Sequence, residues 1–481
     1  MKIEKVKLTP AGCAVDLGDG SERGLYVNQD YILHKLGRPM RGINLMYCYY
    51  PYDETWPMRS SEAYKDMEVH GAWDYPYDDY FPYKGGVEGD TTGEPFTCMQ
   101  DVRRHGQDVV LTMTIDPKLD DERIIQIAKD LRPYGRMMLR LNHEASGDWF
   151  EFTKRATYAQ IGDFFVRFKR LMSLHAPNVK LILCIEGFKN PDEKEVPRQA
   201  DFEEAIRETD FWSIDQYIAL NWGWPYEVAE VDNFQHQRSD AKDVFNNFKR
   251  TYKHFKALTG QDKKILMSEL NADGDVTGQY DQCELVKEFV ESIKNDSEQG
   301  WCGGFTLYQF RDDGRLGLEF TDPNNSSVGI EQPLMKTFKE LIHDDYFRPG
   351  LEIAGADELP IRLRWGGAED AEGVSMELDF ESAPVFAELN FPEELIDANL
   401  MMEIGGTWFY KASGVKYIDM MSAFYDSDFA GGKLRLNIFA PPASGKNDES
   451  QGADWDINYY YDIKALPEVR LRFKPIVEGK K

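Results

Sequence analysis

The sequence predicts a (β/α)₈ TIM barrel followed by an antiparallel β-sandwich. From about residue 41 to residue 342, short apolar segments alternate with amphipathic ones, as in parallel α/β folds. After about residue 350 the helical periodicity ends, and segments of period-two alternation follow. A chain of 481 residues also suits two domains. We expect the catalytic barrel at 1–348 and the accessory sandwich at 349–481.

The N-terminal segment predicts a short hairpin. Residues 2–8 and 13–17 alternate polar with apolar positions, and Gly12 lies between them. Seven apolar segments then predict barrel strands: 42–47, 109–115, 137–142, 180–185, 211–217, 265–268 and 304–310. A closed barrel needs an eighth strand. We expect it between residues 48 and 100, although no segment there has a clear strand pattern.

Five segments predict the helices that cover the barrel. Apolar residues recur at helical spacing over 124–131, 158–172, 245–255, 285–293 and 334–342. Gly260 suits the end of the third helix and Pro333 the first turn of the fifth. Period-two strands of the second domain are predicted at 361–365, 374–378, 434–438 and 469–473. We interpret all of these patterns as core packing.

Composition excludes several classes of partner. The formal net charge is -28, from 84 acidic and 56 basic residues, so the surface repels nucleic acid. No apolar run reaches the roughly 18 residues of a membrane span, which predicts no membrane partner. The N-terminus has no secretory apolar stretch, so we expect a cytoplasmic protein, or a secreted one whose signal was removed. The six cysteines form no C-x-x-C pair, which predicts buried thiols.

Polar residues at the strand ends carry the chemistry, because barrel active sites lie at the carboxyl ends of the strands. Glu144 and Glu269 each directly follow an apolar strand. A lone glutamate at such a place is more often a surface or ion-pair carboxylate, and Glu186 and Asp215 compete for the same role. A pair of carboxyls is nevertheless what glycoside hydrolysis needs, one as a proton donor and one facing the anomeric carbon. We therefore expect Glu144 and Glu269 to face each other at one rim.

At these residues the chain resembles the clan A glycoside hydrolases, most closely family 26, which includes β-mannanases. The similar segments are His143-Glu144, Gly147 to Phe150 and Asp215-Gln216-Tyr217. The resemblance implies a retaining enzyme with Glu144 as general acid/base, Glu269 as nucleophile and Tyr217 bonded to the nucleophile. The eighth strand departs from the clan pattern, because it offers Tyr308 to Arg311 where a tryptophan is usual. This departure puts mannan specificity in doubt.

A carbohydrate is the expected partner. The candidate substrate-binding residues are Asn142, His143, Trp149, Tyr217, Trp222, Gln309, Arg311 and Tyr47. Many tyrosines and tryptophans also crowd residues 47–83, where rings could stack on sugar faces. Any single one of these rings is better explained by loop packing, but as a set they predict a lined cleft. We expect no cofactor and no metal, because no second histidine or cysteine lies at ligand spacing, although calcium among the loop aspartates stays open.

Two alternatives remain at this point. The same carboxyl pair would also serve a transglycosylase or a phosphorylase, and the latter needs a basic phosphate pocket for which only Arg311 and Arg315 are at hand. The second alternative is a non-catalytic carbohydrate-binding protein. The sugar, its linkage, the choice between endo and exo action and the oligomeric state are not fixed by the sequence.

Overall fold

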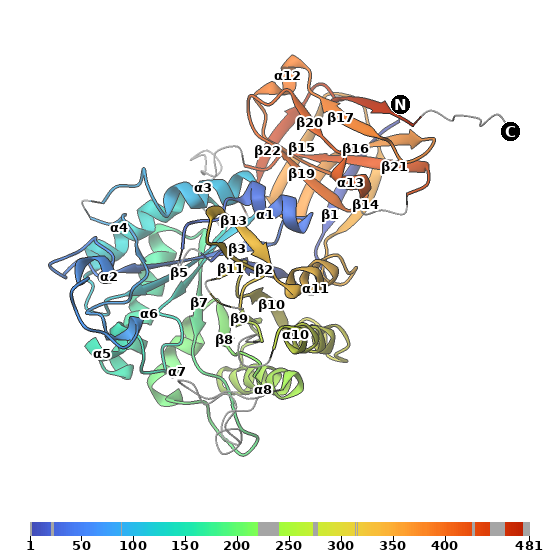
Figure 1. The fold of residues 1–481 in the computed structure, drawn as a ribbon. Coiled ribbons are helices and arrows are strands. Elements are labelled where there is room, and N and C mark those ends of the chain that lie inside the picture. The colour runs from blue at the N-terminus through green and yellow to red at the C-terminus, as the bar shows by residue number, and fades with distance from the viewer. Residues whose placement is uncertain are drawn as a thin grey trace, which may run out of the picture.

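The computed structural model describes residues 2–20, 24–87, 89–219, 240–272, 278–312, 314, 316–425, 429–442 and 457–474. Figure 1 shows a barrel surrounded by helices and a second body of β-strands that holds both the N-terminal strand and the last strands of the chain. The predicted fold class is thereby confirmed.

The barrel is closed by eight parallel strands. In spatial order they are β2 (Val15–Gly18), β3 (Gly42–Tyr49), β5 (Asp108–Ile115), β6 (Met137–Leu141), β7 (Val179–Cys184), β8 (Phe211–Asp215), β9 (Ile265–Leu270) and β10 (Cys302–Leu307). Strand β2 pairs with both β10 and β3 and closes the ring. The short β4 (Phe81–Pro82) extends the sheet beside β3. All seven predicted strands are present.

The predicted N-terminal hairpin is wrong. Strand β1 (Ile3–Thr9) pairs antiparallel with β14 (Gly350–Ala356) and β16 (Asp370–Phe380) of the second body. Strand β2 is the eighth barrel strand, so the search for it between residues 48 and 100 was misplaced. Period-two alternation reports which face of a strand is buried but not which strand lies beside it, and only long-range pairing separates the two segments.

Helices cover the barrel where the apolar periodicity predicts them. These are α4 (Asp121–Leu131), α6 (Tyr158–His175), α8 (Ala241–Thr259), α10 (Gln279–Lys294) and α11 (Pro333–Ile342), joined by α1 (Gln29–Leu36), α3 (Phe96–Arg104) and α7 (Gln199–Glu208). Thr157 and Gln160 form a capping box on α6, and Gly260 ends α8 with a φ of 71°. No described helix is long and apolar enough to cross a membrane.

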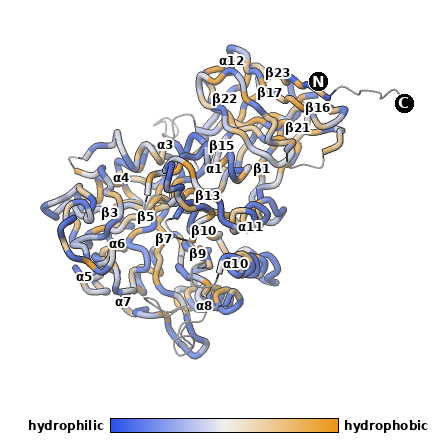
Figure 2. The backbone as a smooth tube through the Cα atoms, viewed as in Figure 1, coloured by the Kyte–Doolittle hydropathy of each residue, from blue (hydrophilic) through white to orange (hydrophobic). Residues whose placement is uncertain are grey.

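The second body contains a large and a small antiparallel sheet. The large sheet has the order β14-β1-β16-β21-β18-β19, with β15 paired to β16 and β22 paired to β15. Its further strands are β15 (Ile361–Gly367), β18 (Leu400–Ile404), β19 (Thr407–Lys411), β21 (Gly432–Phe439) and β22 (Tyr459–Ile463). The small sheet contains β17 (Phe386–Asn390), β20 (Tyr417–Asp419) and β23 (Glu468–Arg472), and α12 (Glu393–Ile396) and α13 (Ser422–Tyr425) are short connecting helices. Figure 2 shows apolar strand segments in both bodies.

Short elements occupy the barrel loops. They are α2 (Ser60–Ala63), the 3₁₀ turns Ala72–Asp74 and Arg132–Tyr134, α5 (Glu151–Arg155), and the small sheet of β11 (Arg311–Asp312), β12 (Glu319–Asp322) and β13 (Asn325–Glu331). The two bodies meet at Trp365, which is fully buried and lies against Gly106 of the barrel. All six cysteines are buried.

Candidate active site

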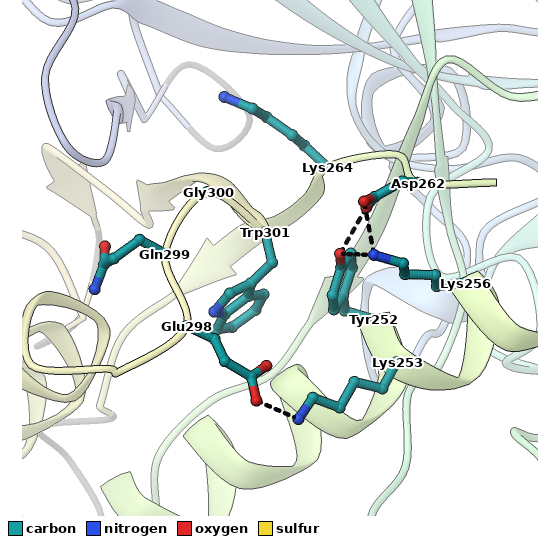
Figure 3. Close-up of a pocket in the computed structure, with 9 residues that line it drawn as sticks. All are labelled: Tyr252, Lys253, Lys256, Asp262, Lys264, Glu298, Gln299, Gly300 and Trp301. Atoms are coloured by element: carbon teal, nitrogen blue, oxygen red, sulfur yellow. Dashed lines mark hydrogen bonds and ion pairs between the residues drawn. The ribbon is translucent and has the colours of Figure 1, made fainter.

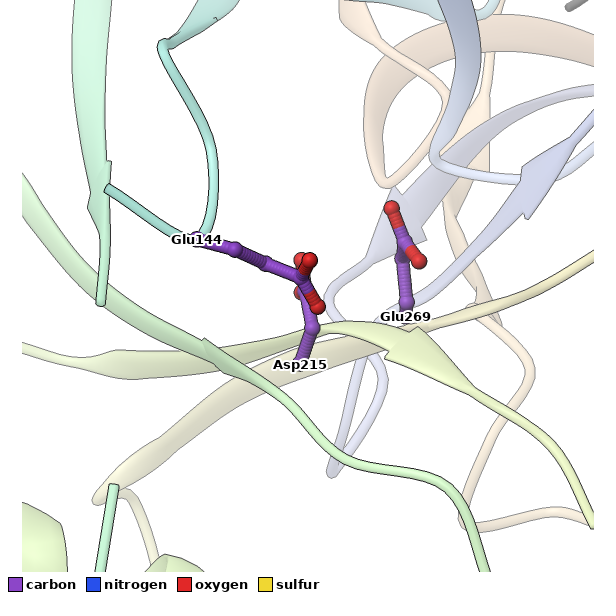
Figure 4. Close-up of side chains that lie close together, drawn as sticks. All are labelled: Glu144, Asp215 and Glu269. Carbon is purple, nitrogen blue, oxygen red and sulfur yellow. The ribbon is translucent and has the colours of Figure 1, made fainter. Parts of the chain in front are cut away.

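Three carboxyl groups converge at the C-terminal end of the barrel. Glu144 follows β6, Asp215 is the last residue of β8, and Glu269 lies near the end of β9. One oxygen of each carboxyl lies within 4.8 Å of the others, and Figure 4 shows the three side chains pointing toward one another. The expectation that Glu144 and Glu269 face each other at one rim is confirmed.

A tight turn aims Glu144 at its neighbours. Asn142 and Glu144 have φ angles of 47° and 51°, in a left-handed region that residues other than glycine rarely adopt. The side chain of Asn142 supports this turn, because its Oδ1 accepts from Ile115 N at 2.6 Å and its Nδ2 donates to Ile115 O at 3.2 Å. Asn142 therefore shapes the turn, and its contact with substrate stays a prediction.

Arg140 is a buried cation shared by two of the carboxyls. Its Nη1 donates to Asp215 Oδ2 and its Nη2 to Glu269 Oε1, each at 2.7 Å, while Nε donates to Thr112 Oγ1 at 2.8 Å. Burial opposes the charge, but Asp215 and Glu269 raise the pKa of Arg140 well above its ordinary value. The guanidinium fork thus fixes the spacing of the two carboxyls.

Glu269 has hydrogen-bond donors on both oxygens. Tyr217 donates its hydroxyl to Oε2 at 2.7 Å, as the family resemblance implied, and Arg140 holds Oε1. His143 Nε2 lies 3.9 Å from Oε1. Burial, followed by the charge of Arg140, lowers the pKa of His143 well below its usual range, so this ring is neutral. Both oxygens of Glu269 are thus held in place by side-chain donors.

Glu144 is arranged to keep a proton. Burial raises its pKa well above the ordinary value, and the charges of Asp215 and Glu269 add to this effect. The indole of Trp149 donates to its Oε2 at 2.8 Å, which opposes the shift only in part. Burial likewise raises the pKa of Asp215 to about 7, against the opposing charge of Arg140. Glu144 and Glu269 therefore have the unequal environments that an acid and a nucleophile need.

The other predicted binding residues lie in different surroundings. Gln309 is buried beyond β10, and its Nε2 has no hydrogen-bond partner among the described residues, so it stays a candidate. Arg311 forms an ion pair with the buried Glu319 in the β11–β12 sheet and also donates to Ser326 O. Trp222 and Arg315 lie outside the described residues.

The prediction for Tyr47 is wrong. Its hydroxyl donates to Cys98 Sγ of α3 at 3.8 Å, and the side chain is part of the core between the barrel and its helices. In β3 the inward positions belong to residues such as Asn44, which accepts from Thr112 of β5. Alternation along the strand then turns Tyr47 outward.

Most rings of residues 47–83 hold the loop in place. Tyr50 donates to Asp78, and Tyr77 donates to the carbonyl of Met58. Arg155 of α5 joins the loop to the barrel, because it pairs with Asp53 and with Asp116 at 2.9 Å each. Loop packing therefore explains these rings better than the lined cleft we expected from them as a set.

Two residues of the site were missed as such. Arg140 lies in an otherwise apolar strand, Met-Met-Leu-Arg-Leu, and a charge inside such a strand is a signal for a buried ion pair. Asp215 was recognised only as a competitor of the two glutamates. The same three carboxyls are the group of described residues with the spacing of a metal site, but the buried Arg140 already provides the positive charge that an ion would supply.

A hollow lies at the opposite end of the barrel from the three carboxyls. It measures about 620 Å³ and lies where α8 ends and β9 and β10 begin. Figure 3 shows most of its charged groups in contact with each other: Lys256 and Tyr252 with Asp262, and Lys253 with Glu298. Such pairing at the N-terminal end of a barrel is typical of a stabilising surface rather than of an active site.

Fold and site together define the class: a (β/α)₈ barrel protein with an acid-like and a base-like glutamate at its C-terminal rim. Solved glycoside hydrolases have a similar fold. The catalytic domain of a family 26 endo-β-1,4-mannanase from Bacillus sp. JAMB-750 is 12% identical over 70% of this chain and 87% of its own, with a TM-score of 0.45. A family 51 α-L-arabinofuranosidase from Bifidobacterium longum is 8% identical over 90% and 99%, with a TM-score of 0.45. A family 128 endo-β-1,3-glucanase from Sorangium cellulosum is 14% identical over 68% and 98%, with a TM-score of 0.41. No protein-family model matches the sequence, and no curated protein does.

Proposed function

We propose that the protein is a retaining glycoside hydrolase that cleaves β-linked oligo- or polysaccharides. The observation that carries the proposal is the pair of unequal glutamates, with oxygens within 4.8 Å of each other at the barrel rim. Retaining enzymes hold their two carboxyls about 5–5.5 Å apart, whereas inverting enzymes leave about 6.5–9.5 Å for a water molecule. Oxygens that lie this near to each other are compatible with the shorter spacing, in which one carboxylate attacks directly.

The roles follow from the surroundings of each group. Glu269, held by Arg140 and Tyr217, attacks the anomeric carbon. Glu144 gives its proton to the leaving oxygen and then takes a proton from the water that releases the sugar from Glu269. The charge on Glu269 supports the first role of Glu144, since it helps to raise the pKa of Glu144.

The alternatives are less well supported. A phosphorylase needs a free cation for phosphate, but Arg311 is paired with Glu319 and Arg140 with two carboxyls. A non-catalytic binding protein has no use for a buried carboxyl that retains its proton beside an ionised one, since burying such groups costs stability. A transglycosylase uses the same first step and differs only in the acceptor.

The test uses aryl β-glycosides with leaving groups of different pKa and a panel of β-linked polysaccharides. Glu269→Ala should lose nearly all activity, and azide should restore part of it with inverted configuration. Glu144→Ala should retain activity on aryl glycosides whose leaving groups depart without protonation. Glu186→Ala is the matched control, because Glu186 also follows a barrel strand but bonds to Ser146 and Lys189 outside the cluster.

The outcomes are decisive. If Glu269→Ala keeps its activity on activated substrates while Glu144→Ala does not, the two roles are reversed. If the wild-type protein and all variants bind oligosaccharide but release no product, the protein is a binding protein. Equal losses in all three variants would also contradict the proposal.

A further inference from the structure

Asp215 is a third carboxyl at the site, and the two-glutamate mechanism gives it no task. Its side chain is fully buried at the end of β8. Oδ2 accepts from Arg140, and the thiol of Cys184 in β7 is the further, weak donor to this carboxyl. A carboxyl buried with so few donors costs stability. This cost indicates a role beyond packing.

The three carboxyls have unequal sets of hydrogen-bond donors. Glu269 receives hydrogen bonds from Arg140 and Tyr217, and Asp215 receives one from Arg140. Glu144 receives one from the neutral indole of Trp149. Three buried negative charges beside one cation would be strongly unfavourable, so at least one proton stays in the cluster. Glu144 has the weakest set of donors and therefore holds it.

The remaining titratable groups around Asp215 add no charge. Cys184 of β7 and Tyr217 face it, and burial raises the pKa of each well above its ordinary value. His143 is neutral because its pKa is lowered. Among the described residues, the charge of Asp215 is thus opposed by that of Glu269 and balanced by that of Arg140.

We infer that Asp215 is a positioning residue that sets the protonation of Glu144, by occupying one arm of Arg140 and placing a second carboxylate beside Glu144. The inference rests on the proposed function for its meaning in catalysis. Before glycosyl transfer, Asp215 helps Glu144 to keep the proton that goes to the leaving oxygen.

After transfer, Glu269 is an ester and has lost its charge, so Arg140 would otherwise attract Glu144. Asp215 neutralises Arg140 at this stage, and Glu144 remains basic enough to take a proton from the attacking water. The water oxygen then bonds to the anomeric carbon, and Glu269 leaves as a carboxylate. Asp215 forms and breaks no bond.

The experiment follows the indole Nε1–H resonance of Trp149 against pH in the full-length protein, because this group donates to Glu144. Trp149→Phe assigns the signal, and Glu144→Gln should remove the titration step that belongs to Glu144. Asp215→Asn keeps an oxygen for Arg140 but removes the charge. We expect its midpoint to fall by about one pH unit or more, as for a unit charge removed at this separation. The basic limb of the rate profile should shift in the same direction.

Asp108→Asn is the matched control. Asp108 is also a buried strand carboxyl paired with arginines, Arg103 and Arg136, but it lies at the opposite end of the barrel. Its substitution should leave the Trp149 midpoint unchanged. An unchanged midpoint in Asp215→Asn, with or without lost activity, overturns the inference and leaves Asp215 as a structural partner of Arg140.

Two further results are informative if Asp215→Asn does not fold or if no glycoside is cleaved. If Asp215→Asn does not fold, the wild-type titration decides, because coupled carboxyls should titrate at Trp149 in two steps. A single step refutes the inference. If no glycoside is cleaved but the midpoint shifts as expected, the proposed function fails and the coupling of Asp215 to Glu144 stands.

Discussion

Tyr217→Phe tests the arrangement around Glu269 most directly. The substitution removes a single hydroxyl, which donates to Glu269 Oε2 at 2.7 Å, and leaves the ring beside Tyr308 in place. A hydrogen bond to a charged group contributes about 1.5–3 kcal/mol. Since each 1.36 kcal/mol corresponds to a tenfold change in rate, we expect kcat/KM to fall by about 10- to 150-fold.

The assay is the initial rate on an activated aryl glycoside, for which protonation of the leaving group matters least. Tyr252→Phe is the control, because its hydroxyl also donates to a carboxylate, Asp262, at 2.6 Å but lies at the opposite end of the barrel. Its rate should stay near that of the wild type. A loss of less than about threefold in Tyr217→Phe, or an equal loss in Tyr252→Phe, would refute the reasoning.

Three further predictions concern stability, each measured by urea unfolding. Arg140→Met leaves Asp215 and Glu269 buried without their cation and should lower the free energy of unfolding by about 3–5 kcal/mol. Arg140→Lys should cause a smaller loss, because an ammonium group keeps the charge but cannot span both carboxyls. Equal stability of the wild type and both variants would contradict the ion-pair account. Glu144→Gln should gain stability relative to the wild type as pH rises from 5 to 8. The pKa of Glu144 is raised above 4.5 in the folded state, so the contribution of Glu144 to the free energy of unfolding is full below pH 4.5 and is lost as pH rises through the folded pKa. A stability difference that stays constant with pH would contradict this prediction. Gly106→Ala adds a Cβ that would lie 2.3 Å from Trp365, at a φ of 76°. Its loss of unfolding free energy should be about 1–3 kcal/mol greater than that of the control Gly300→Ala, where φ is 84° but no atom lies within 4 Å. Equal losses would show that the two bodies do not pack at Trp365.

Much of the fold and the core of the site could be predicted from local sequence pattern. Helical stripes such as that of 158–172 and apolar runs such as that of 109–115 report burial directly, because the periods 3.6 and 2 follow from backbone geometry. In a barrel, all strand ends meet at one rim. Counting strands backward from residue 310 was therefore enough to bring Glu144 and Glu269 to the same site.

Tertiary structure decided everything that depends on which segments are neighbours. The partner of β1, the identity of β2 as the eighth barrel strand and the outward direction of Tyr47 all depend on pairing over long stretches of chain. The same is true of the site. Arg140 reaches Asp215 and Glu269 across 75 and 129 residues of sequence, and no local pattern records such a contact. The sequence by itself determined the positions of the two glutamates, whereas only the folded barrel brought Arg140 and Tyr217 to Glu269 and raised the pKa of Glu144 through burial.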